Sequence, residues 1–68
     1  MSGTPMDLIR KLDETATALL ELARRVRAAA ADVADPALRE EMLGSAAGWE
    51  RRAQEMSDAI LRWKREIN

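Results

Sequence analysis

Apolar residues in the second half of the chain recur at alternating intervals of four and three residues. Because this spacing is kept for more than three heptads, it predicts a narrow apolar seam along one helix of about residues 36–67. Both tryptophans belong to the seam and lie two heptads apart, on one edge of the helix. The seam comprises Met42, Ala46, Trp49, Ala53, Met56, Ile60, Trp63 and Ile67.

The first half of the chain carries a second heptad seam, which predicts a helix of about residues 5–34. Leu8, Leu20 and Leu22 widen its apolar arc to about 160° of the helix surface, which is more than one neighbouring helix covers. We therefore expect this helix to contact two neighbours. Its two rows are Ile9, Ala16, Ala23 and Ala30, and Leu12, Leu19, Val26 and Val33.

Capping signals mark where both helices begin. Thr4 is followed by Pro5 and then by Asp7, an arrangement typical of a capping box at a helix N-terminus. Asp35 and Pro36 give a second signal, because proline disfavours helical conformation in the preceding residue and fits the first position of a new helix. The turn at residues 34–36 is tight, and tight connections make helices antiparallel neighbours.

The predicted fold class is thus all-α, with residues 1–68 forming a single two-helix antiparallel hairpin. Folding near residue 35 places Trp63 beside Leu8 and Ile9, and sets the large side chains of the second helix against the alanine row of the first. Gly44 and Gly48 each weaken the second helix by about 1 kcal/mol relative to alanine. We expect that helix to continue through them because the heptad phase is preserved; an end at residue 43 is the alternative.

Composition makes a second copy of the chain the favoured source of extra stability. A chain of 68 residues buries only about 60% of its unfolded surface, so its own core is marginal. The sequence has no cysteine and no histidine, which excludes disulfides and thiolate chemistry and removes the usual general base and the commonest metal ligand. We expect no enzyme activity and no cofactor, and we predict a homodimeric four-helix bundle.

The residues predicted to form the core and the self-association surface are large and apolar in nearly every case. For the tryptophans the alternative is a ligand pocket, although an aromatic residue at a heptad core position usually serves packing. The predicted set is Leu12, Leu19, Leu20, Leu22, Val26, Met42, Trp49, Met56, Ile60 and Trp63.

A sparser apolar stripe lies about 100° from the seam of the second helix. It consists of Leu43, Ala47 and Leu61. Two interpretations make it functional: a further intersubunit contact, or a surface on which another protein docks. In the third interpretation the two leucines are scattered exposed residues.

The charges nearly cancel, with 11 basic against 12 acidic residues and a net charge of -1. No long-range field therefore draws in nucleic acid or an anionic membrane. The expected function is that of a small noncatalytic assembly or adaptor protein that self-associates through its heptad seams, with an unknown partner. The alternative function is a nucleic-acid-binding regulator that uses arginine clusters on the dimer. Those candidate contacts are Arg24, Arg25, Arg27, Arg51 and Arg52.

Local charge pairs favour a solvated face over a binding site. Three acid-first pairs are spaced for contact on a helix surface: Asp7 with Lys11, Glu21 with Arg25, and Asp58 with Arg62. The longest unbroken apolar run covers only residues 28–31, and the first residues lack the pattern of a signal peptide. The expected location is cytoplasmic, without membrane association.

The segment ADPALREEMLGSAAGWERRAQEM, residues 34–56, resembles a pattern in small helical proteins of bacteria, notably alphaproteobacteria. The resemblance covers about a third of the chain and implies a bacterial helical protein of unknown activity, with no functional residues to carry over. Gly44 and Gly48 depart from the pattern, where better helix formers are expected. The matching residues are Asp35, Pro36, Leu38, Arg39, Met42, Leu43, Ala46, Trp49, Arg51 and Ala53.

Overall fold

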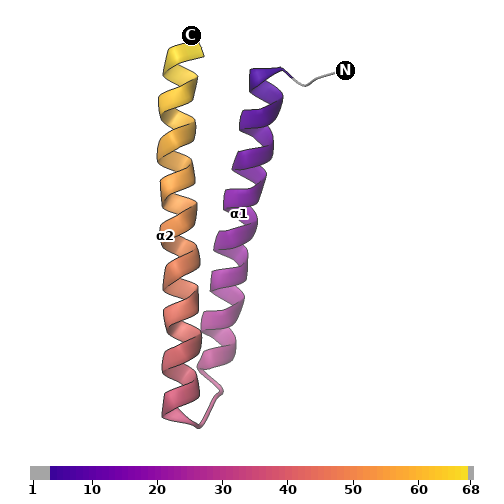
Figure 1. The fold of residues 1–68 in the computed structure, drawn as a ribbon. Helices are drawn as coiled ribbons and strands as arrows, with labels where there is room; N and C mark the ends of the chain where they lie inside the picture. Colours follow the sequence, from indigo (N-terminus) through magenta and orange to yellow (C-terminus); the bar gives the residue numbers. More distant parts are fainter. Residues whose placement is uncertain (1–3, 68) are drawn as a thin grey trace.

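Two long helices packed side by side make up the fold, an antiparallel hairpin (Figure 1). The computed structural model describes residues 4–67. Helix α1 spans Pro5–Ala30 and helix α2 spans Pro36–Ile67, and the described part of the chain contains no strand. The prediction of an all-α helical hairpin is confirmed. With extents of 49 × 22 × 14 Å, the hairpin is only one helix pair thick.

Helix α1 begins with the predicted capping box. The amide of Asp7 donates to Oγ1 of Thr4 at 3.2 Å, and the amide of Thr4 donates to Oδ2 of Asp7 at 3.3 Å. Pro5 occupies the first helical position, where its missing amide proton costs no hydrogen bond. Two of the otherwise unpaired groups at this helix end are thereby satisfied.

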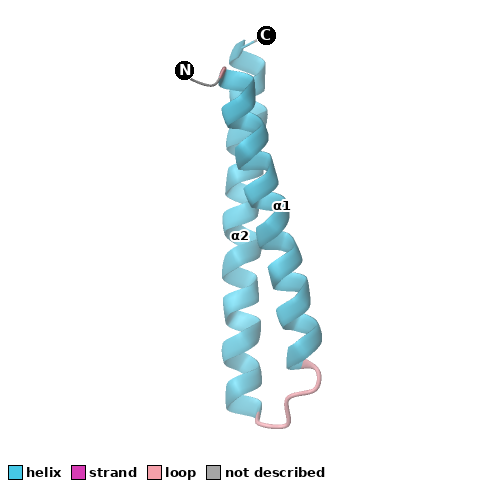
Figure 2. Ribbon diagram, turned by 90° about the vertical axis from the view of Figure 1, so that its right-hand side faces the viewer, coloured by secondary structure: helices cyan, strands magenta, loops and turns pink. Residues whose placement is uncertain are grey.

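Helix α1 ends earlier than the sequence predicts, at Ala30 instead of residue 34. The amides of Asp32 and Val33 donate to carbonyls three residues back, both at 3.1 Å, so the chain tightens before it leaves the helix. The connection therefore covers residues 31–35 (Figure 2). A helix continued to residue 34 would leave only Asp35 to cross to α2, and Pro36 already disfavours helical conformation there.

Two side chains fix the loop to the start of α2. Oδ1 of Asp35 accepts a hydrogen bond from the amide of Ala37 at 3.0 Å, as expected of the residue that caps the helix. The guanidinium of Arg39 donates from Nε and Nη2 to the carbonyl of Val33, at 3.1 and 2.8 Å. The last residues of the loop are thus held against the first turn of α2.

Helix α2 is continuous, so the alternative in which it ends at residue 43 is wrong. Neither Gly44 nor Gly48 has a positive φ. The glycines therefore adopt ordinary helical conformation and leave the phase of the seam intact.

The buried core consists almost entirely of small side chains. No large side chain is fully buried in the described part of the chain. The heptad pattern predicts that large residues of the second helix pack against alanine, whereas Met42, Trp49 and Met56 are only half-buried. The buried residues, which we call the alanine seam, are Ile9, Ala16, Ala23, Ala30, Ala46, Ala53 and Ile60.

Gly44→Ala is expected to raise the free energy of unfolding by about 1 kcal/mol, because alanine loses less backbone entropy than glycine in a helix. A Cβ atom built at this position meets no other atom within 4 Å, so no clash offsets the gain. Urea unfolding at one fixed protein concentration measures the change. A loss of stability would contradict the open space seen at this position.

Candidate interaction surface

One side of the hairpin is polar and is closed by a charged pair. Arg27 of α1 donates to Glu50 of α2 through two hydrogen bonds, Nε to Oε2 at 2.8 Å and Nη2 to Oε1 at 2.6 Å. Arg27 follows Ala23 by four residues and Glu50 follows Ala46 by four, so both lie on the same flank of the alanine seam. We call this flank the polar side.

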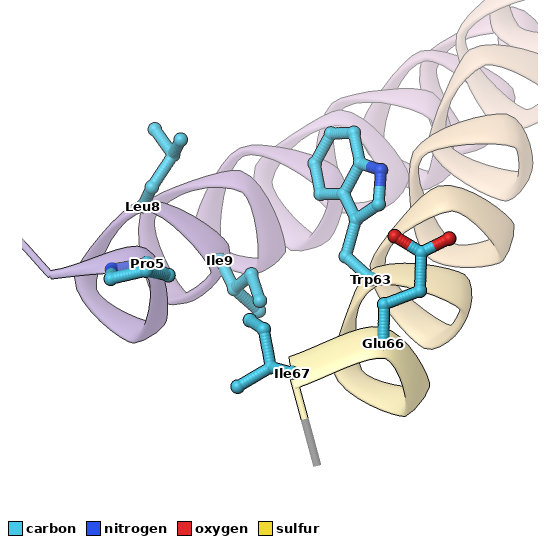
Figure 3. A pocket seen from close by; sticks show the side chains of 6 residues that line it. All are labelled: Pro5, Leu8, Ile9, Trp63, Glu66 and Ile67. Carbon is cyan, nitrogen blue, oxygen red and sulfur yellow. The ribbon is translucent and has the colours of Figure 1, made fainter.

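The opposite side carries large apolar residues from both helices. Figure 3 shows Leu8 and Trp63 projecting from the same side of the hairpin, while Ile9 and Ile67 lie between the helices. The heptad spacing continues this face from the open end towards the loop. We call it the apolar face, and its members are Leu8, Leu12, Leu19, Leu22, Val26, Met42, Trp49, Met56 and Trp63.

The apolar face is poorly covered in the hairpin. Leu8 is 60% exposed, Leu22 is 42% exposed and Trp63 is 39% exposed. The other members of the face are only half-buried. Continuous apolar surface of this kind is uncommon on soluble monomers and typically marks an interaction site.

The total exposed surface also exceeds that of a compact chain. A folded monomer of 7.6 kDa is expected to expose about 4,300 Å². The hairpin exposes 5302 Å², which is about 1,000 Å² more than this expectation. The excess is close to the surface that each partner buries in a standard protein interface, about 800 Å².

The predicted self-association residues divide among three environments. Ile60 is buried in the alanine seam, and Leu22 and Trp63 are exposed on the apolar face. Leu20 is 43% exposed but follows Ala16 by four residues, which places it on the polar side. The remaining six are half-buried on the apolar face.

Leu8 belongs to the apolar face but is absent from the predicted self-association set. The sequence does contain the signal, because Leu8 lies two heptads before Leu22 and widens the same arc. The sequence does not show on which side of the alanine seam each of the residues that widen this arc lies.

The second apolar stripe lies away from the apolar face. Leu43 precedes Glu50 by one heptad and therefore shares the polar side with it. Leu43 and Ala47 are half-buried, and Leu61 is 61% exposed. The two proposed roles of this stripe, as a further intersubunit contact or as a docking surface for another protein, stay predictions.

The candidate nucleic-acid contacts do not gather into one strip. Arg27 is bound to Glu50, while Arg24, Arg25, Arg51 and Arg52 are exposed. Arg24 and Arg25 are adjacent on a helix and point about 100° apart. The nucleic-acid interpretation stays a prediction.

None of the three predicted local ion pairs is formed within residues 4–67. Asp7 pairs with Arg10 instead of Lys11, and Asp58 accepts a hydrogen bond from Gln54 at 3.1 Å. Within residues 4–67, the pairs Glu21 with Arg25 and Asp58 with Arg62 do not come within ion-pair distance. Exposed ion pairs of this kind contribute little to stability, so their spacing in the sequence does not by itself determine which of them form.

A hollow of about 300 Å³ opens at the end of the hairpin where α1 begins and α2 ends (Figure 3). Glu66 supplies the one charged side chain of its lining. The indole of Trp63 stands at this hollow with Leu8 and Ile9, which agrees with the predicted pairing of these residues. The lining residues are Pro5, Leu8, Ile9, Trp63, Glu66 and Ile67.

Within residues 4–67, no group of three or more Asp or Glu residues could hold a metal ion. Neither α1 nor α2 contains an apolar stretch of the length and hydropathy needed to cross a membrane.

Ala23→Leu is expected to lower the free energy of unfolding by about 1–3 kcal/mol, because the added atoms overfill a tightly packed contact. Ala23 is 0% exposed, at the centre of the alanine seam. Ala28→Leu is the matched control: Ala28 is exposed on the same helix, and the change should stay within about 0.5 kcal/mol. Equal effects of the two substitutions in chemical unfolding would contradict close packing along the seam.

The Arg27–Glu50 pair is expected to make stability depend on pH. The hydrogen bonds donated by Arg27 hold the pKa of Glu50 below its usual value of 4.5, against a smaller opposing effect of desolvation. This contribution is therefore present above pH 4.5 and is lost as the pH falls through the lowered pKa of the folded state. It is modest, because both side chains are partly exposed.

Urea unfolding of the wild type and Glu50→Gln at pH 7 and pH 3 measures this effect. The wild type should be the more stable at pH 7, and the difference should shrink at pH 3. Glu21→Gln is the control, because Glu21 is exposed and has no ion pair within residues 4–67. A difference that does not change between the two pH values would show that the pair is not formed in solution.

Comparisons with known proteins leave the interpretation to the residues and their geometry. The chain matches no protein-family model, no curated protein and no solved structure. The resemblance of residues 34–56 to small bacterial helical proteins stays a prediction.

Proposed function

We propose that this protein is a noncatalytic assembly module that forms a homodimeric four-helix bundle through its apolar face. One observation carries the proposal. The residues buried between the two helices are mostly alanines, while the tryptophan, methionine and leucine side chains of the apolar face are left partly exposed to water. A second apolar face of the same shape supplies the cover that these side chains lack.

The excess of exposed surface over that of a compact chain of this mass is large enough for a stable dimer. Burial of about 1,000 Å² per copy would give a total of about 2,000 Å², at the upper end of the standard range for specific interfaces. Trp49 lies near the middle of the face, where aromatic residues contribute most to binding. The dimer leaves the polar sides outward, and these carry the stripe of Leu43, Ala47 and Leu61 as the surface offered to another protein.

The oligomeric state tests the proposal. In sedimentation equilibrium, the wild type should behave as a particle of twice the 7.6 kDa chain mass at micromolar concentration. Leu22→Glu should weaken the dimer at least about tenfold, because it buries an unpaired carboxylate. Leu22 is already partly exposed in the hairpin, so circular dichroism should still report a helical chain.

Leu61→Glu provides the matched control. It introduces the same charge at a position that is 61% exposed on α2, away from the apolar face. The control variant should keep the dimer. A wild type that stays monomeric, or equal dissociation by both substitutions, would refute self-association through the apolar face.

A further inference from the structure

We infer that the two hairpins of the dimer pack with their loops at opposite ends, so that α1 lies against α1 of the second copy and α2 against α2. This inference rests on the proposed dimer. A four-helix bundle in which all neighbours are antiparallel can be built from two hairpins in two ways. With the loops at the same end, each α1 would instead lie against α2 of the second copy.

Two contacts between α1 and α2 show which residues lie level across the seam. At the open end, Ile9 and Trp63 line the same hollow. Nearer the loop, Arg27 donates to Glu50. The helices run in opposite directions, so Lys11 lies within about one helical turn of the level of Arg62, and Asp32 within about one turn of the level of Glu41.

Charged residues follow the outer edges of the apolar face. Lys11 lies three residues after Leu8 and therefore borders the face on the α1 edge. Asp32 lies in the turn directly after α1, where its amide donates to the carbonyl of Ala29 at 3.1 Å, so it continues this edge beyond the end of the helix. Arg62 and Glu41 border the face in the same way on the α2 edge, one turn after Ala59 and Leu38. All four charged residues are exposed, and none of them has an ion pair within the range 4–67.

Loops at the same end would set like charges against each other. Lys11 would face Arg62 of the second copy near the open end, and Asp32 would face Glu41 near the loops. Symmetry repeats each contact, so four repulsive contacts would border one interface. Leu22 would also face Arg52, a charged side chain in place of an apolar partner.

Loops at opposite ends reverse these contacts. Lys11 then meets Asp32 of the second copy along the paired α1 helices, and Glu41 meets Arg62 along the paired α2 helices. Opposite charges at the rim of an interface favour the arrangement that brings them together.

The centre of the opposite-end arrangement lies on a single two-fold axis. Leu22 meets Leu22 of the second copy at this axis, which completes an apolar contact. Arg52 lies at nearly the same level on α2 and faces Arg52 of the second copy, which is one like-charge contact against the four of the other arrangement; Glu55 of each chain, one turn away, offsets it. The same two-fold axis relates both helix pairs, as a symmetric dimer requires.

The direction in which one charge reversal changes the dimer dissociation constant distinguishes the two arrangements. With loops at opposite ends, Lys11→Glu places a carboxylate against Asp32, and the dimer dissociation constant should rise about three- to tenfold at low salt. With loops at the same end, the new carboxylate would face Arg62 and the constant would fall. Arg24→Glu, an exposed change on the far side of α1, should leave it nearly unchanged.

A double variant completes the charge test. Lys11→Glu combined with Asp32→Lys restores opposite charges along the paired α1 helices, and the dissociation constant should return towards the wild-type value. Sedimentation equilibrium at low and high salt measures all variants, and salt should reduce the differences. Tighter association of the Lys11→Glu variant would overturn the opposite-end arrangement while leaving the dimer itself intact.

A single engineered cysteine tests the same arrangement by geometry. The chain has no native cysteine, so Leu22→Cys can form only one disulfide, between the two copies. Mild oxidation should link the copies rapidly, because the two positions meet at the two-fold axis. Leu61→Cys introduces an exposed thiol on the outer surface of the dimer, and disulfide formation between the copies should be slow.

The outcomes distinguish failure of the inference from failure of the proposed function. Rapid linkage of the Leu22→Cys variant supports opposite ends. Slow linkage in a wild-type-like dimer overturns that arrangement, because same-end loops would place the two Leu22 positions on diagonal helices. A wild-type chain that sediments as a monomer overturns the dimer and the arrangement together.

Discussion

Close packing of alanine against alanine is the constraint on which the rest of this hairpin depends. Ala16, Ala23 and Ala30 of α1 and Ala46 and Ala53 of α2 are buried, and none of them can be enlarged without separating the helices or straining the contact. Small side chains let the backbones approach, and this leaves no room between them for an indole or a thioether. The large residues are therefore displaced to one flank, which becomes the apolar face.

Local signals in the sequence were sufficient to predict the helices and where they begin. The capping box at Thr4 and the Asp35–Pro36 start depend only on neighbouring residues, so they survive any tertiary arrangement. The end of α1 depends on the path between helices. Residues 31–34 are compatible with helix in isolation, and the need to cross to α2 overrides that preference.

The candidate surface was only partly readable from the heptad pattern. The pattern identifies two rows on each helix, but the distance between the helix axes decides which row is buried, and that distance depends on both helices at once. Leu20 and Leu22 widen the same arc in the sequence, yet the seam runs between them and puts Leu20 on the polar side. The position of α2 relative to α1 decides on which side of the seam each leucine lies, and this position is known only from the folded hairpin.

Stability and association are coupled in such a molecule. The hairpin orders more than sixty residues, at a conformational cost of order 1 kcal/mol each or more, while its buried core offers five alanines and two isoleucines. The side chains with the most apolar surface to remove from water are those of the apolar face, and most of that gain is realised only when a second surface covers them. In the proposed dimer the apolar face therefore serves as recognition surface and as the missing half of the core. Thermal stability then depends on protein concentration, because association removes from water the apolar side chains that the hairpin alone leaves exposed.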